Sequence, residues 1–102
     1  MKHLKRLHRE QPCVDIEEQA AATINIAAAA TETTAGLEEG YYDVHVSQNA
    51  YVKIAPTAND VTAGTGYLQL ANTVVTYVVR EGSKIGCIRD AADGVLRYHR
   101  VG

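Results

Sequence analysis

The residues best suited to catalysis in this sequence are its four histidines, His3, His8, His45 and His99. His3 and His8 are five residues apart, which does not place two metal ligands on one helix face. His45 follows Asp43 by two residues, so in a strand the two side chains would share a face and could touch. A metal or proton-transfer site needs a third group, and the local sequence specifies none. We therefore expect His45 and His99 to be structural or solvated.

The other candidate motifs also lack the partners that their chemistry requires. Glu17–Glu18 and Glu38–Glu39 are adjacent pairs that would point to opposite strand faces or lie in loops, unlike the convergent carboxylates of a glycosidase. Gly64–Thr65–Gly66 has the glycines of a phosphate loop without its lysine and following helix. Asn59–Asp60 offers oxygen ligands without the spacing of an EF-hand. The sequence predicts a protein that is not an enzyme and that uses no metal or other cofactor.

Cys13 and Cys87 are the two cysteines, which are too few for a disulfide framework. Small buried or half-buried thiols are the favoured interpretation. A single bridge between the two and a reactive thiol stay open as alternatives, although no histidine or aspartate motif beside either cysteine supports the reactive thiol.

Short strands are the elements that must position these side chains. Tyr41–Ser47 and Ala50–Ala55 alternate apolar and polar residues, and the turn residues between them predict a hairpin. Pro56–Gly66 has the composition of a loop. Four further strands are predicted at Tyr67–Leu70, Thr73–Arg80, Lys84–Arg89 and Val95–Val101. Asp93–Gly94 is expected to close a hairpin into the last of them.

The first part of the chain is less clearly patterned. Ala22–Ala27 is predicted as a strand, with a short helix as the alternative. Six or seven short antiparallel strands, with no crossover helix, indicate an all-β fold. The expected architecture is a small β-sandwich, jelly-roll-like or barrel body with an extended N-terminal arm.

The length and composition fit one small domain with a thin core. The chain has 102 residues, and its 46% hydrophobic fraction contains no Trp or Phe. A core of Val, Ile, Leu and Ala is thin, and such cores often gain stability by burying surface against neighbours. No apolar run reaches the roughly 18–20 residues of a membrane span. The basic start lacks the apolar stretch of a secretory signal, so synthesis in the cytoplasm is expected.

Charge is unevenly distributed, and this bears on partners. The net charge of −2 argues against nucleic acid as the main partner. Residues 1–10 carry four basic side chains and one acidic side chain. Residues 11–60 carry one basic and eight acidic side chains, and residues 61–102 carry five basic and three acidic side chains. Such a chain can complement another copy of itself or a patterned protein surface, although an ordinary mixed surface gives the same counts.

We assign residues 1–12 to a basic arm and residues 13–102 to one β domain. The arm's candidate partner-binding residues are Lys2, Leu4, Lys5, Arg6, Leu7 and Arg9. The two leucines permit a short amphipathic helix on contact, while a solvated tail or contact with nucleic acid are alternatives. In the last strand, Arg97 and Arg100 would put a basic group on both faces, which favours an edge or interface strand. A charged edge that only prevents aggregation is the alternative.

The order of motifs in the second half resembles a known group of proteins. The motifs are Tyr51–Ile54, Ala55–Ala58, Leu68–Ala71, Tyr77–Val79, Glu81–Ile85 and Asp93–Leu96. Their succession resembles small structural proteins that tailed bacteriophages encode beside their capsid genes, some of which are similar to capsid decoration (cement) proteins with a β-sandwich body.

This resemblance implies a non-enzymatic virion protein that binds and stabilises the capsid shell. Its partners would be the major capsid protein and further copies of itself, with a trimer favoured, and without a membrane. The arm, Arg97 and Arg100 would contact the shell. Two alternatives stay open, namely a carbohydrate- or receptor-binding β module using Pro56–Gly66 and exposed tyrosines such as Tyr41 or Tyr51, and a minor tail or connector component.

Overall fold

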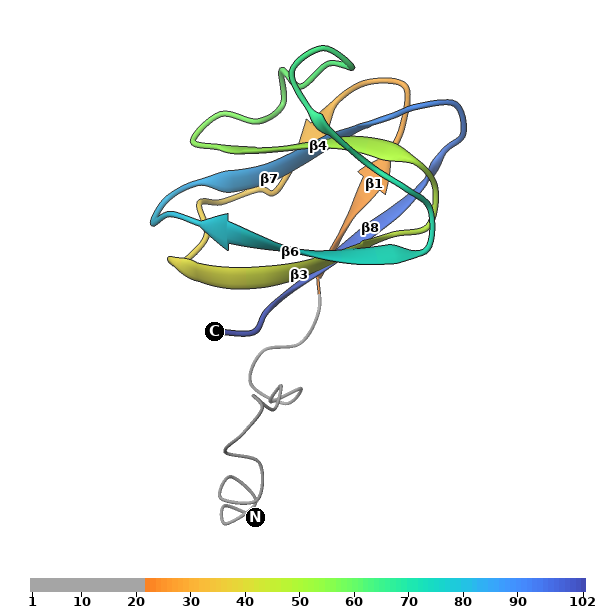
Figure 1. Ribbon diagram of the computed structural model, residues 1–102. Coiled ribbons are helices and arrows are strands. Elements are labelled where there is room, and N and C mark those ends of the chain that lie inside the picture. The colour runs from red at the N-terminus through yellow and green to blue at the C-terminus, as the bar shows by residue number, and fades with distance from the viewer. Residues whose placement is uncertain (1–21) are drawn as a thin grey trace, which may run out of the picture.

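The computed structural model describes residues 22–102, which form two antiparallel sheets of four strands each (Figure 1). The eight strands are β1 (Ala22–Ile26), β2 (Thr31–Glu32), β3 (Gly40–Val46), β4 (Ala50–Ala55), β5 (Tyr67–Gln69), β6 (Thr73–Val79), β7 (Lys84–Arg89) and β8 (Gly94–Arg100). Sheet A has the order β1-β8-β3-β6, and sheet B has the order β2-β7-β4-β5. The predicted all-β fold is confirmed as a two-layer sandwich. The described residues contain no helix that could cross a membrane.

Strand positions were predictable from sequence, but strand pairing was not. The predicted hairpin of β3 and β4 is wrong, because β3 lies in sheet A and β4 in sheet B. The predicted hairpin at Asp93–Gly94 is wrong for the same reason, since β7 and β8 also lie in different sheets. Each of these short connections carries the chain across the sandwich. Among the described strands, only β4 and β5 are consecutive and paired, and the loop Pro56–Gly66 joins them.

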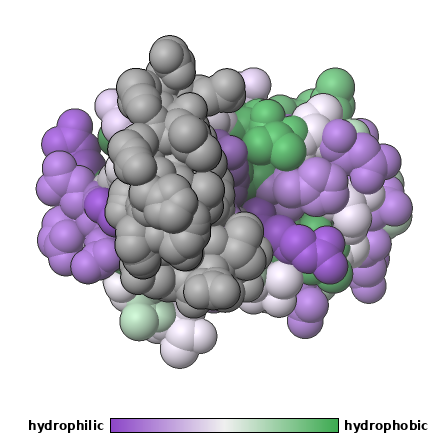
Figure 2. Space-filling view, turned by 90° about the horizontal axis from the view of Figure 1, so that it is seen from below, coloured by the Kyte–Doolittle hydropathy of each residue, from purple (hydrophilic) through white to green (hydrophobic). Residues whose placement is uncertain are grey.

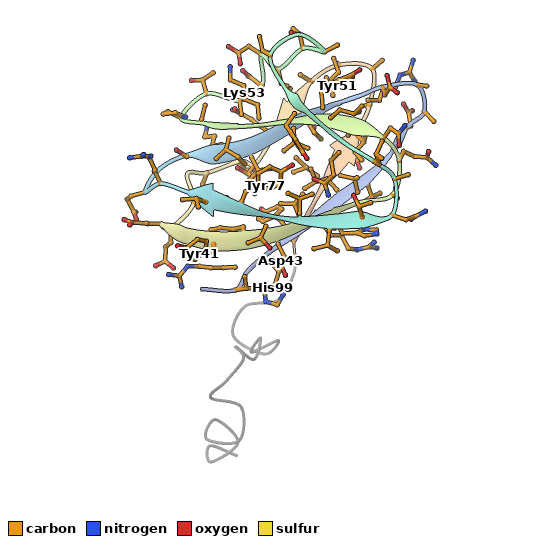
Figure 3. The ribbon with its side chains drawn as sticks, viewed as in Figure 1. Tyr41, Asp43, Tyr51, Lys53, Tyr77 and His99 are labelled. Carbon is orange, nitrogen blue, oxygen red and sulfur yellow. The ribbon has the colours of Figure 1, made fainter. Side chains whose placement is uncertain are left out.

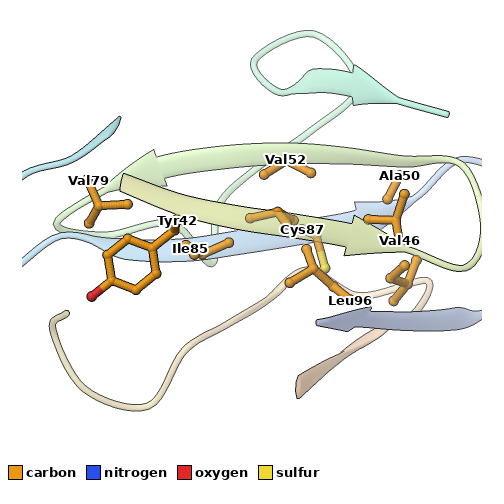
Figure 4. Packing of buried hydrophobic residues seen from close by; sticks show 10 residues of the cluster. Tyr42, Val46, Ala50, Val52, Val79, Ile85, Cys87 and Leu96 are labelled. Atoms are coloured by element: carbon orange, nitrogen blue, oxygen red, sulfur yellow. The ribbon is translucent and has the colours of Figure 1, made fainter. Parts of the chain in front are cut away.

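Alternation within the strands builds the core between the two sheets. Tyr42, Val44 and Val46 of β3 are buried, whereas the residues between them are more exposed. They pack against residues of sheet B such as Val52 and Ile85 (Figure 4). Since burying one Val, Leu or Ile side chain contributes about 1.5–3 kcal/mol, a cluster of ten buried residues, seven of them Val, Leu or Ile and only Tyr42 aromatic, is as thin a core as the composition predicts.

The edge strands are not those that charge suggested. We predicted an edge position for the last strand because basic groups stand on both of its faces. This is wrong, because β8 lies between β1 and β3. The edges of sheet A are instead β1 and β6, and the longer of these, β6, has the uncharged sequence TVVTYVV. Uncharged β-branched runs are typical of strands covered on both sides, whereas edge strands usually carry charge or proline.

The first third of the chain contains one strand that was predicted and one that was not. The strand predicted at Ala22–Ala27 is present as β1, which ends at Ile26, and β2 is a two-residue strand that the alanine-rich composition did not indicate. The arm, residues 1–12, and Cys13 lie outside the described residues.

Candidate interaction surface

The large apolar side chains that are most exposed gather along one side of the sandwich. Among the described residues they are Tyr41, Tyr67, Leu68, Leu70, Val74 and Val78. Five of them belong to β5, β6 and the turn between these strands, where each sheet ends. The sixth, Tyr41 of β3, is the register partner of Val78. We call these six residues the β5–β6 edge surface.

This surface differs from the ordinary scatter of exposed apolar residues. Val74 and Val78 are 58% and 64% exposed and stand on the same face of β6, four residues apart. Figure 2 looks onto the outer side of sheet A and shows green apolar areas beside purple hydrophilic ones. Single exposed hydrophobic residues need no explanation, but several of them on two neighbouring edge strands make this side of the sandwich the candidate interaction surface.

The backbone of β6 offers a row of hydrogen-bonding groups to solvent. Val101 donates to the carbonyl of Tyr41, and Tyr41 donates to Gly102, so Tyr41 directs both backbone groups toward β8. The backbone groups of alternate residues in an antiparallel strand point to opposite neighbours, so the N–H and C=O groups of Tyr42 and Val44 point toward β6. Their register partners there are Tyr77 and Val75.

The residues of β6 that alternate with Val75 and Tyr77 therefore direct their backbone groups away from β3. Val74, Thr76 and Val78 direct their N–H and C=O groups outward, and no other described strand pairs with that side of β6. We call these groups the free edge of β6. The side chains of the same three residues are exposed as well, on the outer face of sheet A, roughly perpendicular to these backbone groups.

A buried amide holds the two edge strands together beneath this surface. Gln69 of β5 is 1% exposed. Its Nε2 donates to the carbonyls of Val44 (2.7 Å) and Thr73 (3.1 Å), and its Oε1 accepts from the Tyr77 hydroxyl at 2.9 Å. Tyr77 lies between the sheets (Figure 3), and its burial raises the pKa of the phenol. Gln69 thus spans from sheet B to sheet A and fixes the spacing of β5 and β6.

The predicted polar pair lies on the outer face of sheet A. Asp43 and His45 share that face, as the spacing predicted, but no hydrogen bond joins them. The Asp43 carboxylate instead accepts from the Thr76 hydroxyl at 2.6 Å. Asp43 is also the register partner of His99, and both side chains point to the same side of the sheet (Figure 3).

The polar residues on this face, Asp43, His45, Thr76 and His99, are not arranged as a reactive site. The Nε2 atom of His99 is buried and has no hydrogen-bond partner among residues 22–102. The Thr76 hydroxyl donates to a carboxylate rather than to an imidazole, so it is not arranged as an activated nucleophile. Among residues 22–102, no three His, Cys, Asp or Glu side chains converge as a metal site would require.

Arg97 and Arg100, the predicted contact residues of the last strand, lie on opposite faces of β8. Arg97 is exposed on the outer face, in register with His45 and Thr23. Arg100 instead donates from Nε and Nη2 to the carbonyl of Glu39, at 3.2 and 3.0 Å. Only Arg97 is therefore available as a surface contact. The six arm residues lie outside the described part of the chain.

The loop Pro56–Gly66 is mostly exposed, but it is anchored to sheet B through the buried Ala58 and Val61. Glu32 accepts from the backbone N–H groups of Ala58 and Asn59 at 2.9 and 3.0 Å and pairs with Lys84 at 3.3 Å. The Ala58 hydrogen bond, followed by Lys84, holds the pKa of Glu32 below its usual value. Ala58 is buried against Gly86, where no larger residue would fit. The loop therefore has less freedom to enclose a ligand than its composition suggested.

Cys87 is a free, fully buried cysteine, as the favoured interpretation of that residue predicted. Burial raises the pKa of its thiol to about 11. Because the thiolate is the reactive form, this thiol is inert at neutral pH.

Comparison with protein-family models, with curated proteins and with solved structures gives no match in any of the three.

Proposed function

We propose that this protein is a non-enzymatic structural protein that binds to a larger protein assembly through its β5–β6 edge surface. One observation carries the proposal, namely the exposed apolar residues Tyr67, Leu68 and Leu70 beside the uncharged seven-residue edge strand β6. Natural proteins protect long edge strands with charge, proline or bulges, because a bare edge invites pairing with another chain. An edge without such protection is consistent with one that is covered when the protein works.

The assembly that we propose is a phage capsid shell, with this chain as a decoration protein on its outer surface. The support is the motif resemblance, together with a thin core that gains stability from a partner. In this proposal Tyr67, Leu68 and Leu70 pack against shell subunits. The exposed Arg97 and the basic arm add charged contacts, which favour encounter more than affinity.

Co-sedimentation with shells assembled from the partner capsid protein tests this proposal. The variant Leu68→Asp/Leu70→Asp places two charges on exposed positions of the surface, and we expect its shell occupancy to fall at least about tenfold. Ala28→Asp/Ala29→Asp is the matched control, since it adds the same charge at exposed positions in the β1–β2 connection.

Two results would count against the proposal. Failure of the wild-type chain to co-sediment would reject the shell as partner. Equal occupancy of both variants would reject the surface. Deletion of residues 1–10 tests the arm separately, because unchanged occupancy would remove it from the contact.

A further inference from the structure

We infer that the free edge of β6 pairs with the same edge of a second copy, joining two A sheets into one continuous sheet of eight strands. This inference goes beyond the proposed shell contact and does not depend on it, because it concerns the chain alone in solution.

The first argument is the symmetry of the residues along the edge. The outward-facing positions of β6 are Val74, Thr76 and Val78, which form a palindrome about Thr76. An antiparallel pair with its two-fold axis at Thr76 places Thr76 opposite its own copy and Val74 opposite Val78 of the partner. Like therefore meets like at every position, as a two-fold interface requires.

The second argument is that this register satisfies every backbone group of the free edge. Val74, Thr76 and Val78 all direct N–H and C=O outward, so each faces a residue that does the same. The three N–H groups of each copy then meet the three C=O groups of the other, giving six hydrogen bonds. If the register were shifted by one residue, Val74, Thr76 and Val78 would lie opposite residues of the partner whose N–H and C=O groups point toward its own β3. These hydrogen bonds would then be lost.

The third argument is electrostatic. The free edge carries no charge, and the next residue at one end, Arg80, would lie opposite Asn72 of the partner. The nearest like charges on the outer face are the two Asp43 carboxylates. They stand three strand spacings apart, about 14 Å, which exceeds the screening length of about 10 Å at 0.1 M salt. No repulsion therefore opposes this pairing.

The pairing is also compatible with the other contacts of the chain. The β1 edge, where the described chain begins at Ala22, lies at the opposite end of sheet A from β6. A β6 pair therefore places the two β1 edges at the far ends of the joined sheet and leaves Tyr67 and Leu68 of β5, and Leu70 in the turn after it, outside the paired backbone. The unit is a two-fold dimer rather than the trimer that the resemblance favoured.

Charge placement at positions 74 and 78 tests both the contact and its register. Analytical ultracentrifugation over a range of concentrations should give wild-type protein twice the 11.0 kDa mass of one chain. Val74→Lys/Val78→Lys and Val74→Glu/Val78→Glu should each be folded monomers by circular dichroism, because like charges then face each other twice. An equimolar mixture of the two should recover the dimer mass.

The variant Val74→Lys/Val78→Glu isolates the register. Within one copy the two positions are four residues apart along a strand, about 13 Å, so they do not pair with each other. Across the two-fold axis each Lys faces a Glu, and this variant should dimerise. Thr23→Lys/Asn25→Lys is the control, with two charges on exposed positions of the β1 edge, and its mass should equal that of the wild type.

A wild-type chain that stays monomeric at all concentrations overturns the inference, and so does a Lys/Lys variant that keeps the wild-type mass. A monomer that nevertheless binds shells, and loses this binding in the Lys/Lys variant, assigns the edge to a shell strand instead. That result rejects self-pairing while sparing the proposed function.

Discussion

Replacing Gln69 by leucine is the most direct test of how the interaction surface is held together. The side chains are similar in size, but leucine cannot donate to the Val44 and Thr73 carbonyls or accept from the Tyr77 hydroxyl. Each buried polar group left without a partner costs about 1–3 kcal/mol. Val44 keeps its other lone pair for the strand ladder, and the half-buried Tyr77 can turn toward water. We therefore expect a net loss of about 2–3 kcal/mol.

Urea unfolding followed by circular dichroism measures this loss, which corresponds to a Tm lowered by about 10–20 °C in a domain of this size. Gln48→Leu is the matched control, because Gln48 is exposed in the β3–β4 connection, and we expect a change within about 0.5 kcal/mol. Combining Tyr77→Phe with Gln69→Leu completes a double-mutant cycle, in which we expect a coupling free energy of about 1 kcal/mol between the two side chains. A Gln69→Leu variant as stable as the wild type would refute the role given to this amide.

Three further predictions concern the parts of the sandwich that hold the surface in place. Cys87, studied in a Cys13→Ser background, should react with a thiol reagent at neutral pH only when urea unfolds the chain, and rapid labelling of the native state would contradict its burial. Glu32→Gln should lower stability near neutral pH. The lowered pKa of Glu32 means that its contribution is present above the ordinary glutamate pKa and is lost as the pH falls through the folded value, so the variant and wild-type urea midpoints should converge in acid. Gly86→Ala should cost about 1–3 kcal/mol because its methyl group meets the Ala58 backbone, whereas Gly64→Ala, whose methyl group makes only an ordinary contact of 3.8 Å with the Thr62 hydroxyl oxygen, should be neutral in the same unfolding assay.

The sequence predicted the strands because their signal is local. The alternation in Tyr41–Ser47 depends on one strand having a buried and a wetter face, and the structure confirms it. For Lys84–Arg89 the predicted and observed bounds agree, although three successive residues of this strand are buried. The loop Pro56–Gly66 was equally clear from its composition.

Pairing was not predictable because it depends on which sheet each strand joins. A three-residue connection such as Ser47–Asn49 is short enough for a hairpin, and no local feature says that it crosses between sheets instead. The misassigned edge has a different cause. Arg97 and Arg100 indicated an edge strand, but one points into solvent from the sheet face and the other ends on a backbone carbonyl, so both are tolerated in a central strand.

The β5–β6 edge surface was not predicted from the sequence, because the sequence does not show that β6 lies at an edge. The run Thr73–Val79 has Val on both faces and no charge, which predicts a central strand. Its symmetry about Thr76 was visible in the sequence, but that symmetry acquires meaning only once β6 is known to end the sheet. Gln69 gave no signal, since a lone glutamine at the end of a short strand is ordinarily exposed.

Hydrogen exchange along β6 tests most directly whether the edge is covered when the protein works. The amides of Val75 and Tyr77 bond to β3 and serve as an internal reference that should be protected in every state. In the assembled wild-type protein we predict that the amides of Val74, Thr76 and Val78 are equally protected, and that they exchange rapidly in the monomeric Val74→Lys/Val78→Lys variant. Rapid exchange at these three positions in the assembled wild type, with Val75 and Tyr77 protected, would contradict the claim.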